Sequence, residues 1–181
     1  MEQDSFQPTY KSDHAHRHQL SLDFIHQFIR QEEKILDLGP VNPLSEKIIN
    51  AGYQLQNTSV QTDLDLDYSP VLNSDYQVLT AFEILEHLVS PFPLLQQSAQ
   101  NKLIASVPLK LWFSKAYWNS TDPFDRHYHE FEPRQFDMLL EKAGWKIIQR
   151  RYLKSKVFKP GIRPILRNFY PRIYLVFCIR A

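Results

Sequence analysis

Apolar and polar positions along this chain follow two patterns, one typical of helices and one typical of buried strands. Apolar residues from Phe24 to Ile29 recur with helical spacing, which predicts an amphipathic helix over residues 21–33. Apolar runs bounded by turn-forming residues predict strands at residues 34–38, 53–60, 76–82, 102–107, 145–153 and 173–179. Because helices and strands alternate, we expect an α/β fold with a mostly parallel sheet covered on both faces.

Capping residues mark the predicted helices between these strands. Asn42 suits an N-cap and Pro43 suits the first turn of a helix over residues 44–51, which Gly52 ends. Two further helices are predicted on the same grounds, at residues 91–100 and 133–143.

The region between the second and third predicted strands is short for a complete βα unit. A crossover between parallel strands needs roughly a dozen residues or more, including its helix. Residues 61–75 offer 15, interrupted by Asp, Ser, Pro and Asn. We therefore expect the third βα unit to be shortened or absent. No helix is predicted between the last two strands, so we expect them to form an antiparallel pair at one side of the sheet.

Length and composition predict one ordinary globular domain. The chain has 181 residues, of which 43% are hydrophobic. Residues 1–19 show no periodicity and are expected to form a flexible arm before a single domain over residues 20–181. The polar N-terminus shows no secretory signal, and the apolar run at residues 174–179 is too short to cross a membrane. These features favour a cytoplasmic location.

Charge is distributed unevenly along the chain. Residues 142–181 contain 11 Lys and Arg and no Asp or Glu, whereas the preceding residues contain 10 basic and 20 acidic side chains. A basic C-terminal region predicts contact with an anionic partner, and residues 146–172 are the candidates for touching RNA or a membrane surface. The alternative is that this region only balances the acidic remainder of the domain.

Two predicted strands end in acidic residues. Asp37 ends the first strand, and Glu83 follows the strand at residues 76–82. In an open α/β sheet, ligands bind at the carboxyl ends of the strands. This pair therefore predicts a polar ligand at that edge.

Four segments in order resemble class I S-adenosylmethionine-dependent methyltransferases, over about residues 20–181. ILDLGP resembles the first strand and glycine turn, and LTAFEILEHL resembles an "EVLEHL" segment of small-molecule methyltransferases. KLIASVP and FEPRQFDMLLEKAGWKII resemble the fifth strand and the following helix, turn and strand. The resemblance implies a Rossmann-like methyltransferase sheet and S-adenosylmethionine as cofactor.

The resemblance also implies positions for the cofactor. Asp37 and Gly39 are expected beside its methionine portion, and Phe82 and Glu83 are expected to line the same pocket. The acids for ribose and adenine are expected within residues 57–67, where Asp63 and Asp65 are the candidates.

The glycine turn departs from the pattern of the family, which has two or three glycines near G-x-G-x-G. Only Gly39 remains, and Val41 and Pro43 occupy the other positions. One hypothesis is that Pro40 and Pro43 form a rigid turn that leaves room for the cofactor. The other is a degenerate site on a non-catalytic protein.

A long loop over residues 109–131 holds the candidate catalytic residues. His127 and His129 lie two apart, and either is a candidate general base for a hydroxyl acceptor. The alternative is that they hold the loop in place through hydrogen bonds or packing. No metal site is expected, because no cysteine and no second ligand pair with helical spacing accompanies them.

The function predicted from these features is methylation, at oxygen, of a small molecule or of a saccharide- or lipid-linked acceptor, for which an anionic group is one option. The alternatives are a non-catalytic protein with the same fold and an RNA methyltransferase, which the basic C-terminal region favours. Residues 1–19 and 109–131 are candidates for a lid over the site.

Overall fold

A six-stranded mixed sheet forms the centre of the molecule, with the strand order β2-β1-β3-β4-β6-β5. The structure is a computed structural model that describes residues 12–122, 125–154 and 170–181. The strands are β1 (Lys34–Asp37), β2 (Gln54–Asn57), β3 (Val78–Phe82), β4 (Lys102–Pro108), β5 (Trp145–Lys154) and β6 (Pro171–Arg180). The helices are α1 (Ser12–Phe28), α2 (Pro43–Asn50), α3 (Pro91–Gln97) and α4 (Pro133–Lys142).

The sheet is parallel in its first part and antiparallel in its last. Strands β2, β1, β3 and β4 run parallel to their neighbours. Strand β6 lies between β4 and β5 and is antiparallel to both. The expected α/β class and the antiparallel C-terminal pair are therefore confirmed. In addition, β6 joins this pair to the parallel strands through β4.

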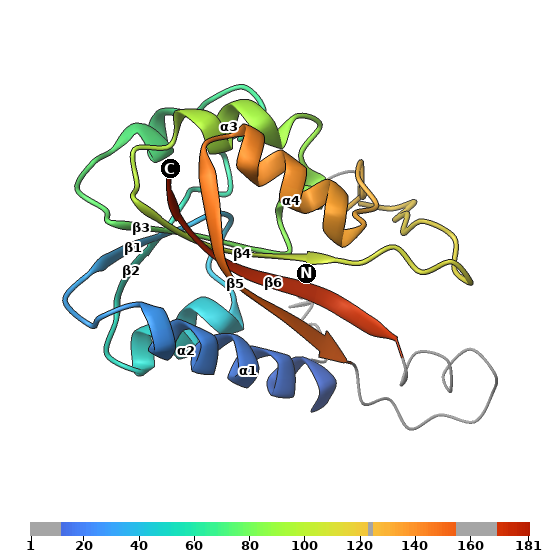
Figure 1. The fold of residues 1–181 in the computed structure, drawn as a ribbon, viewed down its shortest axis with the longest axis horizontal. Coiled ribbons are helices and arrows are strands. Elements are labelled where there is room, and N and C mark those ends of the chain that lie inside the picture. Colours follow the sequence, from blue (N-terminus) through green and yellow to red (C-terminus); the bar gives the residue numbers. More distant parts are fainter. Residues whose placement is uncertain (1–11, 123–124, 155–169) are drawn as a thin grey trace, which may run out of the picture.

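The helices form two layers, one on each face of the sheet (Figure 1). Helices α1 and α2 cover one face, and their apolar residues, including Phe24 and Ile48, pack into one buried cluster. Helices α3 and α4 cover the other face, where Leu94 and Phe136 belong to a second cluster. Strand residues alternate between these two clusters, so both faces of the sheet are buried.

The connection from β2 to β3 contains only a short 3-10 helix, η1 (Ser69–Leu72). No strand or α-helix occurs in it, which confirms that the third βα unit is reduced. Strand β2 consequently lies at the edge of the sheet.

Several element boundaries differ from those predicted, among them the end of α1, which lies at Phe28 rather than at residue 33. Helix α1 begins at Ser12 rather than at residue 21, so residues 12–19 of the expected arm are helical. Strand β2 ends at Asn57 instead of residue 60, and the Thr58 N–H makes a last hydrogen bond to the Asp37 carbonyl of β1 at 2.9 Å. Residues 1–11, the rest of the expected arm, lie outside the described residues.

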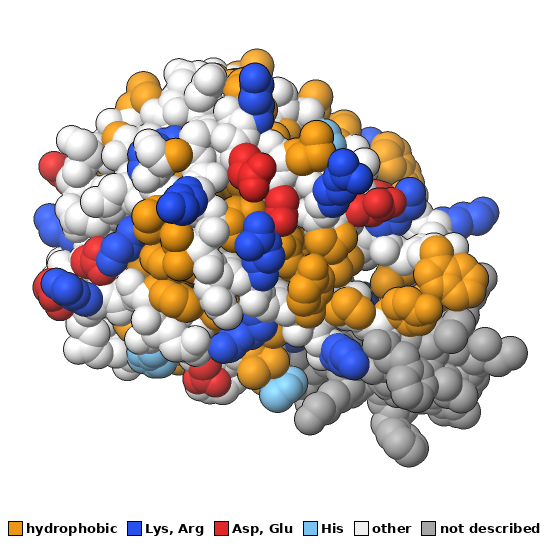
Figure 2. Space-filling model, in the orientation of Figure 1, with side chains coloured by type: hydrophobic (Ala, Val, Ile, Leu, Met, Phe, Trp, Pro, Cys, Tyr) orange, Lys and Arg blue, Asp and Glu red, His pale blue; other side chains and the backbone are white. Residues whose placement is uncertain are grey.

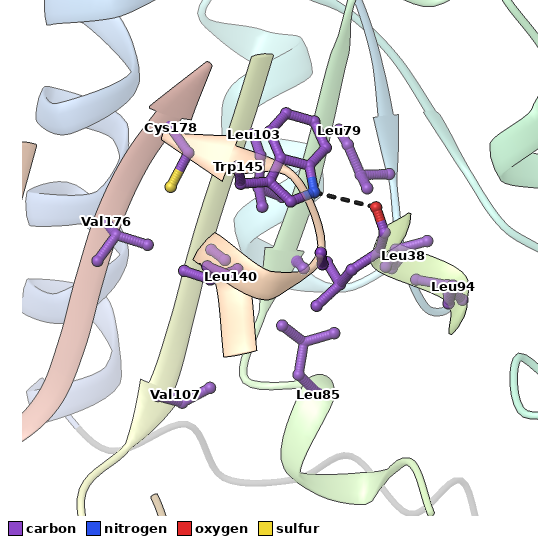
Figure 3. Packing of buried hydrophobic residues seen from close by; sticks show 14 of the residues in the cluster. Leu38, Leu79, Leu85, Leu94, Leu103, Val107, Leu140, Trp145, Val176 and Cys178 are labelled. Atoms are coloured by element: carbon purple, nitrogen blue, oxygen red, sulfur yellow. Dashed lines mark hydrogen bonds between the residues drawn. The ribbon is translucent and has the colours of Figure 1, made fainter. Parts of the chain in front are cut away.

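Trp145 joins the end of β5 to the core beneath α3 and α4 (Figure 3). Its side chain is 1% exposed, and its indole N–H donates to the Leu95 carbonyl at 3.0 Å. The Arg180 guanidinium lies over the indole ring at 4.0 Å and donates to the Ser98 carbonyl and, at 3.2 Å, to the Ala143 carbonyl. The last carbonyls of α3 and α4 are thus satisfied from β6.

No helix among the described residues has the length and apolar character needed to cross a membrane.

Replacing Trp145 with Phe tests this packing. Trp145→Phe should lower the free energy of unfolding by about 1–3 kcal/mol, because the indole hydrogen bond and part of the buried volume are lost. Trp112→Phe is the matched control, since Trp112 is 72% exposed, and it should change stability by less than about 0.5 kcal/mol. Urea unfolding of both variants measures the difference, and equal effects would contradict the assigned role.

Candidate functional site

A cavity of about 550 Å³ lies at the carboxyl ends of β1 and β3. Four parts of the chain surround it: the side of α1, the turns that follow β1 and β3 together with the start of α2, the ends of β5 and β6, and the long loop after β4. The lining residues are Arg17, His18, Ser21, Leu38, Gly39, Pro40, Asn42, Leu44, Phe82, Glu83, Ile84, Asp125, Leu153 and Ile173. The cavity therefore stands at the edge of the sheet where open α/β folds bind ligands.

The turn after β1 is shaped by Gly39. Its φ of +97° lies in the left-handed region, and a Cβ there would meet the Ile84 Cδ1 atom at 3.2 Å. The Gly39 N–H donates to the Thr58 hydroxyl at 2.7 Å, which ties the turn to the end of β2. Asn42 then caps α2 by accepting from the Leu44 and Ser45 N–H groups, as its type and position predict.

Asp37 lies directly behind this turn and does not line the cavity. Its side chain is 2% exposed and accepts hydrogen bonds from the Thr80 hydroxyl at 2.6 Å and from the Asn57 amide at 2.9 Å. Burial raises the pKa of Asp37 to about 7 from its ordinary value of 3.8, although these hydrogen bonds act in the opposite direction. The carboxyl group thus joins the ends of three neighbouring strands.

Glu83 projects into the cavity from the end of β3. Its φ of +50° is unusual for a residue other than glycine, so the backbone is strained at this point. An Arg17 Nη1 atom from α1 lies 2.9 and 2.8 Å from the two carboxylate oxygens. The cavity wall therefore carries a cation and an anion side by side.

The structure does not bring the other two predicted acids to the cavity. Asp65 accepts from the Val89 and Ser90 N–H groups at 2.9 and 2.8 Å, at the start of α3. Asp63 is exposed and accepts from the Asp65 N–H at 3.0 Å. The structure gives no support for a ribose-binding role of either residue.

The two predicted catalytic histidines lie outside the cavity lining and contact different neighbours. The ring of His127 meets those of His87 and Tyr117, each with centroids 4.8 Å apart. Burial lowers the pKa of His127, and the nearby His87 acts in the same direction. His129 places Nε2 3.2 Å from the Val89 carbonyl and stacks on Phe131.

Sequence reasoning missed several residues at the site. Arg17 was placed in the expected arm, although Arg17 and Ser21 are one helical turn apart and both line the cavity. That spacing was the available signal for a longer α1. Asn57 and Thr58, which stabilise the glycine turn, carry no signal of their own in the sequence.

Comparisons with known proteins support the fold. No family model matches this chain, and no curated protein matches it. A solved structure of a putative S-adenosylmethionine dependent methyltransferase from Listeria monocytogenes matches with a TM-score of 0.57 and 10% identity, over 92% of this chain and 99% of its own.

Two further solved structures match over most of their length. Magnesium protoporphyrin IX methyltransferase from Synechocystis PCC 6803, with bound SAH, has a TM-score of 0.62 and 14% identity, covering 93% of this chain and 84% of its own. A putative methyltransferase from Haloferax volcanii, in complex with the Trm112 methyltransferase activator, has a TM-score of 0.61 and 9% identity, covering 91% and 89%. The chain therefore has the Rossmann-like fold of class I S-adenosylmethionine-dependent methyltransferases.

The burial of Asp37 predicts a specific dependence of stability on pH. Below about pH 4 the Asp37 carboxyl is protonated in both the folded and the unfolded chain. Between about pH 4 and 7 it ionises in the unfolded chain but not in the folded one, so the free energy of unfolding falls as pH rises. Asp37→Asn should match the wild type near pH 4 and exceed it in free energy of unfolding by a few kcal/mol (about 3–4) at pH 8. Urea unfolding at both pH values measures this, and a difference that does not change with pH would contradict it.

Proposed function

We propose that this protein is an S-adenosylmethionine-dependent methyltransferase. One observation supports this most directly: the cavity at the ends of β1 and β3 combines the turn that contains Gly39 with an Arg17–Glu83 pair. The match to the methyltransferase fold makes this edge of the sheet the expected place for the cofactor.

The residues around the cavity fit the methionine end of the cofactor. That end is a zwitterion, whose ammonium group would pair with the Glu83 carboxylate and whose carboxylate would pair with the Arg17 guanidinium. Gly39 allows the ligand to approach the backbone closely. The cavity volume of about 550 Å³ is within the range of small-molecule sites.

The ribose side of the site is built differently from the pattern expected for the family. Asn57 and Thr58 stand at the end of β2, and both already hold the glycine turn. Neutral groups bind hydroxyls less strongly than a carboxylate does. Asp63 and Asp65 remain candidates only if residues 58–67 rearrange when ligand binds.

Methyl transfer needs little from the protein beyond alignment. When bound, S-adenosylmethionine supplies an electrophilic methyl group, and the chain must orient the acceptor and exclude water. We propose a small-molecule or saccharide- or lipid-linked acceptor, methylated at oxygen. His127 and His129 are the candidates to take the proton from a hydroxyl acceptor, which is needed only if that proton leaves during attack.

The basic C-terminal region gives weaker support for an anionic acceptor, RNA or a membrane surface. Residues 155–169 of this region lie outside the described residues. In the described part, Arg150 pairs with Asp137 at 3.0 Å. Figure 2 shows basic and acidic side chains interspersed on the visible face, and they do not form one large basic patch there.

Calorimetric titration with S-adenosylhomocysteine tests the cofactor site. Wild type should bind, and Glu83→Gln should weaken binding at least about tenfold, because it keeps the shape but removes the charge that pairs with the ammonium group. No binding by the wild-type protein would instead support the degenerate, non-catalytic alternative.

Two glycine substitutions provide a matched comparison for the same titration. Gly39 and Gly144 both have a positive φ, so alanine should destabilise each by about 1 kcal/mol or more. Only Gly39 lines the cavity, so Gly39→Ala should also reduce binding at least about tenfold while Gly144→Ala leaves it unchanged. Equal binding by the two variants would show that the ligand binds elsewhere.

A further inference from the structure

A buried carboxyl group beside the cavity has an unsatisfied oxygen. Glu86 lies in the short 3-10 helix η2 (Leu85–His87), and its side chain is 1% exposed. Its Oε2 atom is buried and has no hydrogen-bond partner among the described residues. Burying a polar atom without a partner costs about 1–3 kcal/mol or more, so native structures rarely contain one without a reason.

Two imidazole rings lie against this carboxyl group. The His87 Nε2 atom is 4.0 Å from Glu86 Oε1, and the rings of His87 and His127 meet edge to face with centroids 4.8 Å apart. One ligand atom from each of Glu86, His87 and His127 can be chosen so that all three lie within 4.8 Å of one another. Three groups that can bind metal thus lie close together, and one of them is the carboxyl group with the unsatisfied oxygen.

Each ring has a polar partner on its outer side: a hydrogen bond for His87 and a longer contact with a carboxylate for His127. The His87 Nδ1 atom is 3.0 Å from the Arg126 carbonyl, which can only accept, so Nδ1 carries the hydrogen. In the neutral ring the lone pair is then on Nε2, the atom nearest Glu86. The His127 Nδ1 atom lies 3.7 Å from Glu130 Oε1. Carbonyl and carboxylate partners of this kind orient metal-binding histidines in other proteins.

The loop that carries His127 is fixed to the turn that carries the other two groups. The N–H groups of Tyr128 and His129 both donate to the Glu86 carbonyl, at 2.8 and 3.2 Å. These bonds join segments that are distant in sequence, and they hold the three side chains close together before any ligand arrives.

We propose that Glu86, His87 and His127 form a binding site for a divalent transition-metal ion of the zinc type. Two imidazoles and one carboxylate are a ligand set of open zinc sites, and imidazole favours zinc over magnesium or calcium. With zinc bonds of about 2.0–2.1 Å, tetrahedral ligand atoms lie roughly 3.3 Å apart, so the side chains would close by about 1 Å. The proposed site differs from the prediction made from the sequence, which was that the chain has no metal site.

The proposed site follows the cavity wall in sequence, although none of its three residues lines the cavity. Glu83 and Ile84 line the cavity and directly precede the turn that carries Glu86, and Asp125 lines it from the loop that carries His127. Three protein ligands leave one position open, and an acceptor oxygen is the expected fourth ligand. His127 would then bind metal rather than act as general base. The inference does not depend on S-adenosylmethionine.

Titration of the metal-free, full-length protein with zinc chloride tests the proposal, with cobalt(II) absorption as a second readout of ligand geometry. Wild type should bind one equivalent. Glu86→Gln and His127→Ala should each weaken binding at least about tenfold. His129→Ala is the matched control on the same loop, and it should bind like the wild type because its ring contacts the Val89 carbonyl and Phe131 instead.

The histidines near the N-terminus are the competing source of zinc binding. A variant with His14, His16 and His18 replaced by Ala should bind zinc like the wild type. Binding lost in that variant, or unchanged in Glu86→Gln, would overturn the proposal. Circular dichroism shows whether each variant still folds. If His127→Ala does not fold, the zinc titration of Glu86→Gln is the test of the proposal. The zinc titration contains no cofactor, so a failure to bind zinc is distinct from a failure to bind S-adenosylhomocysteine.

Discussion

The hydrogen bonds of the buried Asp37 carboxyl group hold together the part of the sheet on which the site depends. Through Thr80 and Asn57 it links the carboxyl ends of β3 and β2 to its own strand, β1. The same Asn57 amide lies 3.2 Å from the Gly39 carbonyl, and Thr58 accepts from the Gly39 N–H. The strand ends and the glycine turn therefore form one connected network. Burying a carboxyl group costs free energy, and the hydrogen bonds of this network offset part of that cost.

This network explains how a turn with a single glycine keeps an open cavity. Substitution of the other glycines would be expected to crowd the ligand, but Val41 and Pro43, which stand at those positions, do not line the cavity. The side chains of Asn57 and Thr58 stabilise the turn from β2, where the pattern of the family would place an acid for ribose. In this protein, side chains at the end of β2 thus support the first turn of the fold.

A second network organises the opposite side of the cavity. The strained Glu83 ends β3, and the turn that follows it carries Glu86 and His87 toward the long loop. Backbone hydrogen bonds from Tyr128 and His129 fix that loop against the turn. The charged groups of the cavity and the three residues of the proposed metal site thus lie on segments that follow the same end of the parallel strands, as the proposed transfer reaction would require.

The order of strands and helices follows from the sequence by itself, because apolar spacing, capping residues and prolines act over a few neighbouring positions. The missing third βα unit is also evident, since chain length limits what a crossover can contain. Gly39, Pro40, Phe82 and Glu83 could be placed at one edge of the sheet, because parallel strands end at the same edge.

Contacts between distant segments were decided only by the tertiary structure. Arg17 meets Glu83 across 66 positions of the chain. Likewise, Asp65 caps α3 rather than reaching the cavity, and His127 joins Glu86 and His87 rather than His129. Such pairings depend on how α1 and the long loop pack against the sheet. Packing of this kind produces no periodic pattern of residues in the sequence, because it depends on the shape and burial of whole elements rather than on neighbouring residues.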